Sequence, residues 1–347
     1  MLDQKRLTTL FENFVNKNDL PKAILKIEDP NRNVLLEVNH GEIEGNSPFA
    51  LASVTKLFTT TLILQLIDEE KITYNSIVTD FIPVEKIARI HKFRDDDYTG
   101  EITIADLLFQ KSGLPNVFYE EPVKLRKRVA TEDFEFTFSE LVEWVRQTES
   151  HFVPASLSSY YADINFVLLG RIAEIITHKS IDDLVDQRIC QKLGLINTFV
   201  ASNEFVAIPP LFVGDRYLKR PKLISSGGAA GGGVSTADDL MTFIHAFISG
   251  KLFDIRHWQK LKQYFPLQED YAPVYYGGGH MKLIIGQYDK PERLSFIGHS
   301  GLSGAFAFYC PQFDLYLSGT TDNAKKSELC IQLLYMILLE IENELKK

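Results

Sequence analysis

The chain has 347 residues, of which 45% are hydrophobic and 24% charged, as is ordinary for a globular protein with a large core. Its formal net charge of −9 at pH 7 argues against nucleic acid as the main partner, because phosphate binding requires a basic face. A basic cluster at residues 124–128 is interpreted as a solvated helix face, with a docking patch as the alternative.

The sequence offers no candidate for a metal site or a membrane segment. Cys190, Cys310 and Cys330 are odd in number and far apart, which indicates free thiols, and the histidines form no His-Glu-x-x-His motif. We therefore expect no metal and no cofactor. No segment approaches the roughly 20 apolar residues that cross a bilayer, and the N-terminus lacks the apolar run of a secretory signal. As written, the chain is expected to be cytoplasmic, or extracytoplasmic if a leader was removed.

The first elements in chain order are a helix and two strands. Apolar residues at helical spacing predict a helix over residues 3–17. Apolar runs at 23–27 and 34–38, on either side of an Asp-Pro-Asn turn, predict two strands.

Ser53 and Lys56 form a Ser-x-x-Lys motif where an apolar, Thr-rich helix is expected to begin. In the first turn of a helix this spacing puts the amine within reach of the hydroxyl. Burial and the positive end of the helix dipole both disfavour an ammonium group, so a neutral Lys56 could take the proton of Ser53 and make it a nucleophile for acyl transfer. The alternative is that Ser53 is only the N-cap of the helix.

The long middle of the chain is expected to be mostly helical. Apolar spacing predicts helices at 57–68, 138–147, 166–177 and 237–248. The Gly-rich segment 227–233 lacks the Gly-Lys-Ser/Thr ending of a phosphate loop. We interpret it as a tight turn beside a cleft rather than as a nucleotide site.

Strands return near the C-terminus. Residues 305–310 and 315–320 are typical of a hairpin, and 327–345 of an amphipathic helix. Strands at both ends predict one α/β sheet subdomain made of residues 1–56 and 274–347, interrupted by a helical inserted subdomain at 57–273.

Two further motifs follow the Ser-x-x-Lys motif along the chain. One is Tyr161-Ala162-Asp163, at the entry to an apolar helix, and the other is His299-Ser300-Gly301, followed by Leu302. Together they resemble the Ser-x-x-Lys, Tyr-x-Asn and Lys-Thr-Gly elements of serine β-lactamases and penicillin-binding proteins. The likeness runs from about residue 45 to about residue 320. It is closest to the class C β-lactamase-like branch, which includes D-alanyl carboxypeptidases, D-aminopeptidases and esterases.

The resemblance implies an α+β fold of the β-lactamase/transpeptidase-like kind. An antiparallel sheet would be flanked by the terminal helices, with the helical subdomain beside it and the active-site groove between them. It also implies that Ser53 attacks a carbonyl and Lys56 takes its proton. Tyr161, drawn toward ionisation by Lys56, would pass the proton to the leaving group or activate the deacylating water.

The same resemblance assigns the remaining site residues. The backbone N–H groups of Ser53 and of Leu302, on the strand after Gly301, would stabilise the oxyanion. Gly301 would let a substrate approach the strand edge. Asp163, His299 and Ser300 would complete the substrate-binding groove.

Two residues depart from the family's pattern. Asp163 stands where Asn is more common, which replaces a hydrogen-bond donor by a carboxylate that only accepts. His299 replaces the Lys of Lys-Thr-Gly, as in the esterase-like members, so a cation facing a substrate carboxylate would be weaker and would titrate near the usual pKa of about 6.5. We therefore expect β-lactams to be poorer substrates than short-chain esters.

Two functions remain open. The first is a serine hydrolase that forms an acyl-enzyme through Ser53 and acts on an ester, amide or lactam, with a small-molecule or peptide-like acyl compound as its substrate. The second is a non-catalytic penicillin-binding-like protein that binds a ligand or acts as a sensor. Intact Ser53, Lys56 and Tyr161 favour the first.

Overall fold

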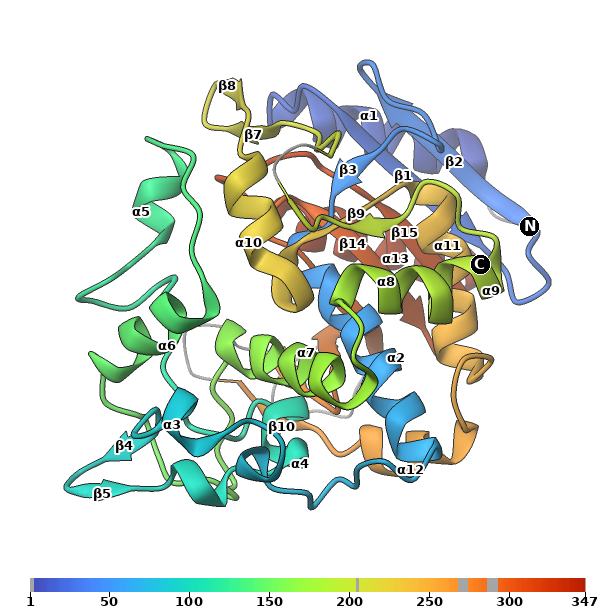
Figure 1. Cartoon of the computed structure of the whole chain (residues 1–347). Coiled ribbons are helices and arrows are strands. Elements are labelled where there is room, and N and C mark those ends of the chain that lie inside the picture. Colours follow the sequence, from blue (N-terminus) through green and yellow to red (C-terminus); the bar gives the residue numbers. More distant parts are fainter. Residues whose placement is uncertain (1–2, 204–205, 268–273, 286–292, 347) are drawn as a thin grey trace.

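A computed structural model describes residues 3–203, 206–267, 274–285 and 293–346 of the chain (Figure 1). At its centre is an eight-stranded sheet in which every neighbouring pair is antiparallel. In spatial order its strands are β10 (Phe265–Pro266), β11 (Val274–Tyr276), β12 (Met281–Ile285), β13 (Leu294–Ser300), β14 (Ala305–Cys310), β15 (Leu315–Thr320), β1 (Ala23–Glu28) and β2 (Val34–His40).

The sheet joins the two ends of the chain. Strand β1 lies between β2 and β15, with Ile24 opposite Thr320 and Glu28 opposite Tyr316. Figure 1 shows this as a blue strand beside a red one. The N-terminal hairpin therefore has no complete sheet to join until the C-terminal strands are in place.

Helices cover both faces of the sheet. The terminal helices, α1 (Gln4–Lys17) and α13 (Leu329–Leu345), pack on one face, where Leu25 and Phe306 belong to the same buried cluster as Phe11 and Leu333. Helix α11 (Ala237–Ser249) packs on the other face, where the Ser318 hydroxyl donates to the Ala237 carbonyl at 2.8 Å. Alternate side chains of one strand point to opposite faces of the sheet. Leu25 therefore packs in the buried cluster under α1 and α13, and Ile24 in the buried cluster on the α11 side.

The helical part is built around α2 (Thr55–Asp68), whose residues are all buried as far as Leu66. It packs against α7 (Asp163–Thr177) and α10 (Pro221–Gly231), and the three lie together at the centre of Figure 1. A helix that is buried on every side needs neighbours on every side. The remaining α-helices are α3 (Val84–Ile87), α4 (Ile104–Leu108), α5 (Arg126–Val129), α6 (Phe138–Arg146), α8 (Ile181–Val185), α9 (Gln191–Leu193) and α12 (Trp258–Leu261).

Shorter elements complete the structure. Strands β3 (Phe49–Ala50), β9 (Gly233–Ser235) and β6 (Phe199–Val200) form a three-stranded sheet in that order. Two small hairpins are β4–β5 (Lys92–Phe93, Asp96–Asp97) and β7–β8 (Leu211–Val213, Arg216–Leu218). Tighter or wider helical turns are η1 (Ala52–Val54), η2 (Val78–Asp80), η3 (Thr99–Glu101), η4 (Asp186–Cys190) and η5 (Ile255–His257).

The α+β class and the sheet flanked by the terminal helices are confirmed. The tight turn expected at 227–233 is reduced to a kink at Gly228, since most of that segment is the end of α10, but the segment does lie beside a cavity, which Gly227, Ala230 and Gly231 line together with Ser53. Its small residues let α10 lie tightly against α7: a Cβ added at Gly170 would lie 2.3 Å from Ala229 Cβ. Packing has thus overcome the low helix propensity of glycine.

The division into two subdomains stays a prediction. Strand β10 already belongs to the large sheet although it precedes residue 274, and α11 packs on that sheet although it lies within 57–273. Residues 268–273, just before the predicted boundary, lie outside the described residues. Within the described chain, each helix is too short or too polar to traverse a lipid bilayer.

Candidate active site

Ser53 is placed by a sharp change from strand to helix. Strand β3 pairs with β9, and the Leu51 N–H donates to the Gly233 carbonyl at 2.8 Å. Ala52 then has a φ of 46°, a left-handed conformation that is costly for a residue with a Cβ. Ser53 follows in η1, a short 3₁₀ turn that directly precedes α2. The prediction that Ser53 lies in the first turn of the α-helix is therefore wrong.

Lys56 lies in the first turn of α2 and is fully buried. Its Nζ atom is 3.1 Å from Ser53 Oγ, 2.6 Å from Asp163 Oδ1 and 2.8 Å from the Ala230 carbonyl oxygen. Burial lowers the pKa of the Lys56 ammonium, while the negative charge of Asp163 acts against that change.

Tyr161 and Asp163 enter the site from the start of α7. The Ala162 N–H between them donates to Gln110 Oε1 at 3.0 Å, which fixes the chain at that point. Asp163 faces Lys56 as its ion-pair partner, in addition to lining the cavity described below. The sequence did not indicate this pairing, because the two residues are far apart in the chain.

The Tyr161 ring packs beside the amine, with Lys56 Nζ 5.1 Å from the ring centroid. Burial raises the pKa of the Tyr161 phenol well above its usual value, the charge of Asp163 raises it further, and the Ser53 side chain acts in the opposite direction. The expectation that Lys56 draws this phenol toward ionisation is therefore wrong. Tyr161 carries its proton at neutral pH.

His299 is the residue before the last in β13 and is buried, with 1% of its surface exposed. Its Nδ1 atom lies 2.7 Å from the Ser300 carbonyl oxygen, which can only accept, so Nδ1 carries the proton. Nε2 then accepts from the Tyr276 hydroxyl at 3.3 Å. Burial, followed by the nearby Lys56 charge, lowers the pKa of His299 to about 3. The prediction that it titrates near 6.5 is therefore wrong.

Gly301 and Leu302 lie in the turn between β13 and β14, and not on a strand as expected for Leu302. The Gly301 N–H donates to the Ala305 carbonyl at 2.8 Å. A Cβ at Gly301 would lie 2.1 Å from the Leu51 carbonyl oxygen, so the missing side chain lets this turn touch the segment that carries Ser53. The Ser300 hydroxyl instead contacts Met281 Sδ at 3.9 Å.

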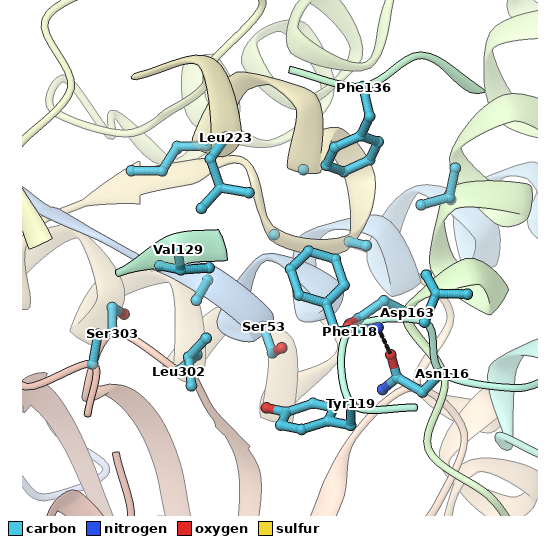
Figure 2. A pocket seen from close by; sticks show the side chains of 18 of the residues that line it. Ser53, Asn116, Phe118, Tyr119, Val129, Phe136, Asp163, Leu223, Leu302 and Ser303 are labelled. Atoms are coloured by element: carbon cyan, nitrogen blue, oxygen red, sulfur yellow. Dashed lines mark hydrogen bonds between the residues drawn. The ribbon is translucent and has the colours of Figure 1, made fainter. Parts of the chain in front are cut away.

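Ser53 opens into an apolar cavity of about 950 Å³, part of which is open to solvent (Figure 2). Leu302, Tyr161 and Asp163 line it together with Ser53, whereas His299, Ser300 and Gly301 are not among its lining residues. In Figure 2 the Ser53 hydroxyl is seen between Phe118 and Tyr119, with Val129 and Leu302 on its other side. Most of the wall comes from the loop around residues 116–136 and from α7 and α10.

Sequence reasoning missed several polar groups at this cavity. Asn116 donates through Nδ2 to the Tyr161 carbonyl at 3.1 Å and accepts from the Phe118 N–H at 3.1 Å, the dashed line in Figure 2. Tyr119 and Ser303 also line the space. The only signal for Asn116 was its place after the Ser-Gly-Leu-Pro segment at residues 112–115. Over the part of the chain that the structure describes, no group of three or more His, Cys, Asp or Glu side chains is arranged to hold a metal ion.

A family model described as Beta-lactamase matches residues 7–328. A curated "Putative D-alanyl-D-alanine carboxypeptidase" from Salmonella schwarzengrund (strain CVM19633) is 32% identical over 154 residues. That match covers 44% of this chain and 34% of the relative, so it spans about a third of the relative's length.

Solved structures share the fold over nearly the whole chain. A D-stereospecific amidohydrolase from Streptomyces sp. has a TM-score of 0.79 at 24% identity, covering 95% of this chain and 98% of that one. D-amino acid amidase from Ochrobactrum anthropi SV3, in complex with L-phenylalanine amide, has a TM-score of 0.79 at 18% identity over 99% of both chains. EstCE1, a hydrolase with promiscuous acyltransferase activity, has a TM-score of 0.76 at 14% identity, covering 96% and 97%.

Proposed function

This chain belongs to the Beta-lactamase family, and we propose that it is a serine hydrolase that forms an acyl-enzyme through Ser53. Its substrate is a small-molecule or peptide-like ester, amide or lactam. Relatives named as amidases and as a D-alanyl carboxypeptidase support an acyl-transfer reaction of this kind.

The observation that carries the proposal is the set of three partners around Lys56 Nζ. A neutral lysine amine has two N–H donors and one lone pair. The Asp163 carboxylate and the Ala230 carbonyl can only accept, so they take the two donors. The lone pair is then left for the Ser53 hydroxyl at 3.1 Å, which makes Lys56 the general base.

In the first step the Ser53 Oγ–H bond breaks, Oγ bonds to the substrate carbonyl carbon, and the proton moves to Lys56 Nζ. The bond to the leaving alcohol or amine then breaks, and the leaving atom takes up one proton. We assign the donor of this proton to Tyr161, which holds its phenol proton and packs beside Lys56; Tyr161 then takes the proton that Lys56 received from Ser53. Water then cleaves the Ser53 ester, which releases a carboxylic acid and restores the hydroxyl.

The tetrahedral intermediate needs donors for its oxyanion. We assign them to the backbone N–H groups of Ser53 and Leu302, whose residues line the cavity together. Gly301 supports this assignment because it keeps the Leu302 turn in contact with the segment before Ser53. His299 has a supporting role from behind the site, since both of its ring nitrogens are engaged by Tyr276 and Ser300.

Labelling with a fluorophosphonate, followed by mass spectrometry, tests this proposal. We expect one equivalent of label on Ser53, and we expect Ser53→Ala to lose both the label and hydrolysis of p-nitrophenyl acetate while circular dichroism shows an intact fold. Ser158→Ala, at an exposed serine, is the control. A fluorescent penicillin that binds without turnover would instead support the non-catalytic function, and retained hydrolysis by folded Ser53→Ala would overturn the mechanism.

A further inference from the structure

The wall of the cavity beside Ser53 has a pronounced chemical bias. Outside the groups next to Ser53, it is formed by aliphatic and aromatic side chains from several elements: Val117, Phe118, Val129, Phe136, Leu141, Ile164, Val167, Leu211, Leu223 and Ile224. Nearly all of these are buried although they border an opening of about 950 Å³. A continuous apolar wall beside the proposed nucleophile suits an apolar group of a ligand.

The charged residues of the cavity wall show the same bias. Among the described residues that line the cavity there is no lysine, arginine or histidine, and Asp163 is the one acidic residue. Asp163 is already paired with Lys56, and Lys56 itself is fully buried beneath Ser53. A carboxylate in this space would lose its hydration and gain no cationic partner.

His299 does not supply the missing cation. Its two ring nitrogens are held by the Ser300 carbonyl and the Tyr276 hydroxyl, and its side chain is not part of the cavity wall. These contacts match a neutral imidazole. Over the described part of the chain, therefore, no positive group lines the path along which an acyl chain would lie.

We propose that the substrate of this site is an uncharged ester or amide with a bulky apolar acyl group, which occupies the cavity formed by Phe118, Val129, Phe136 and Leu223. This inference rests on the proposed serine hydrolase function. The acyl part is the better occupant because it stays bonded to Ser53 between the two steps, whereas the leaving group must reach solvent after the first.

Chain length tests the apolar part of the proposal. We expect kcat/KM for p-nitrophenyl esters to rise from acetate through butyrate to hexanoate by at least about tenfold in total, because each methylene moved from water into an apolar wall contributes about a fourfold gain. A flat series, or acetate as the best substrate, would overturn the proposal. Labelled Ser53 in the same sample would then show that only the acyl preference had failed.

A matched pair of substrates tests the charge part. The p-nitrophenyl ester of pentanoic acid and the p-nitrophenyl hemiester of glutaric acid have acyl chains of the same number of carbons and differ in one terminal carboxylate. We expect the neutral ester to be preferred by about tenfold or more. Equal rates, or a preference for the hemiester, would mean that a cation reaches the acyl chain.

Leu223→Gln keeps the size of the side chain and adds an amide to the wall. The ratio of kcat/KM for hexanoate to that for acetate should fall at least about threefold in this variant. Ile196→Gln, at a residue that is 88% exposed and outside the cavity, should leave the ratio unchanged. An unchanged ratio in folded Leu223→Gln would count against the assigned wall.

Binding to the Ser53→Ala variant gives a readout that needs no turnover. Octanamide should bind this variant more tightly than butanamide, and heptanedioic acid monoamide, which ends in a carboxylate, more weakly than octanamide. If esters are not hydrolysed and Ser53 is not labelled, the proposed function fails. The amide series then still decides whether the cavity accepts an apolar chain, and equal binding of all three would refute it.

Discussion

Asp163 Oδ1 lies 2.6 Å from Lys56 Nζ, so the proposed general base shares its buried position with an acidic partner. This contact has two opposite consequences. It orients the amine toward Ser53, and it also favours the ammonium form, which cannot accept the serine proton. Lys56 can act as a base only when its amine is neutral. Burial lowers the pKa of this amine and Asp163 raises it, so the two together set the pH above which Lys56 can accept a proton.

Asp163→Asn should move the acidic limb of the kcat/KM profile to lower pH. The amide keeps an oxygen that accepts from Lys56 but removes the charge that stabilises the ammonium, so the pKa of Lys56 falls further below its usual value. The measurement is kcat/KM for p-nitrophenyl acetate against pH. Asp215→Asn, at an exposed turn, is the control. An acidic limb at the same pH in all three proteins would show that Lys56 is not the titrating group.

Lys56→Met should slow the labelling of Ser53 by fluorophosphonate about 100-fold or more, which is within the range for a positioned proton acceptor. Methionine fills a similar volume, so the loss reports the missing base and not a cavity. Circular dichroism and the thermal midpoint check the fold. A folded variant that labels at the wild-type rate would exclude Lys56 as the base.

Tyr161→Phe should lower the release of amine or alcohol from substrates with poor leaving groups far more than the release of p-nitrophenolate, since the latter leaves without protonation. Single-turnover kinetics with an anilide and a p-nitrophenyl ester of the same acid make the comparison. Tyr160→Phe removes a neighbouring hydroxyl that donates to Glu120 at 2.9 Å and is the control. Equal losses on both substrates would indicate a structural role for Tyr161.

Gly301→Ala should lower activity on every ester and reduce the free energy of unfolding by about 1–3 kcal/mol, the usual cost of overpacking. The new Cβ would lie 2.1 Å from the Leu51 carbonyl oxygen and 3.2 Å from Ala52 Cβ, which pushes the oxyanion turn away from Ser53. Gly100→Ala is the matched control, because a Cβ there meets no atom within 4 Å. Urea unfolding and kcat/KM are the two measurements, and full activity of Gly301→Ala would contradict this geometry.

Stability should fall as the pH is lowered from 6.5 toward 4.5. Burial lowers the pKa of His299 to about 3 and those of His245 and His280 to about 4, so the unfolded chain binds protons in this range and the folded chain does not. The loss reaches about 2 kcal/mol per histidine at pH 5. Burial also lowers the pKa of His91, which adds to this loss, whereas Asp322, with its pKa raised to about 6 by burial, and Glu28, whose pKa burial also raises, act in the opposite direction.

Urea unfolding at several pH values measures this loss. His280→Gln should flatten the dependence because it removes one of the histidines whose pKa burial lowers. A free energy of unfolding that stays constant between pH 7 and pH 5 would mean that these histidines are accessible to protons in the folded state.

Local patterns were sufficient for most of the fold. The terminal helix, both hairpins and α11 follow from apolar spacing and turn residues, and the order of Ser53, Tyr161 and His299 indicated the family. The helix α10 was missed because it is held by close contact with α7, at Gly170 and Ala229, and not by its own residues. Propensity alone gives no information on such a contact.

The ion pairs and protonation states of the site residues could not be predicted from the sequence for a related reason. The pairing of Lys56 with Asp163, and the burial of His299 behind Tyr276, depend on which segments the fold brings together. A histidine in water titrates near 6.5, and only its surroundings in the folded chain show that this one stays neutral. The apolar wall from Val117 to Ile224 likewise comes from segments that have no common motif.

The pairing of β1 with β15 also has a consequence for synthesis on the ribosome. The N-terminal hairpin emerges first, but the strand beside it is made only after nearly all of the chain has left the tunnel. Until then the edge of β1 that will meet β15 exposes its N–H and C=O groups and is open to pairing with other chains. Closure of the sheet is therefore expected late in folding, so nascent chains should depend on chaperones more than chains whose first strands pair locally.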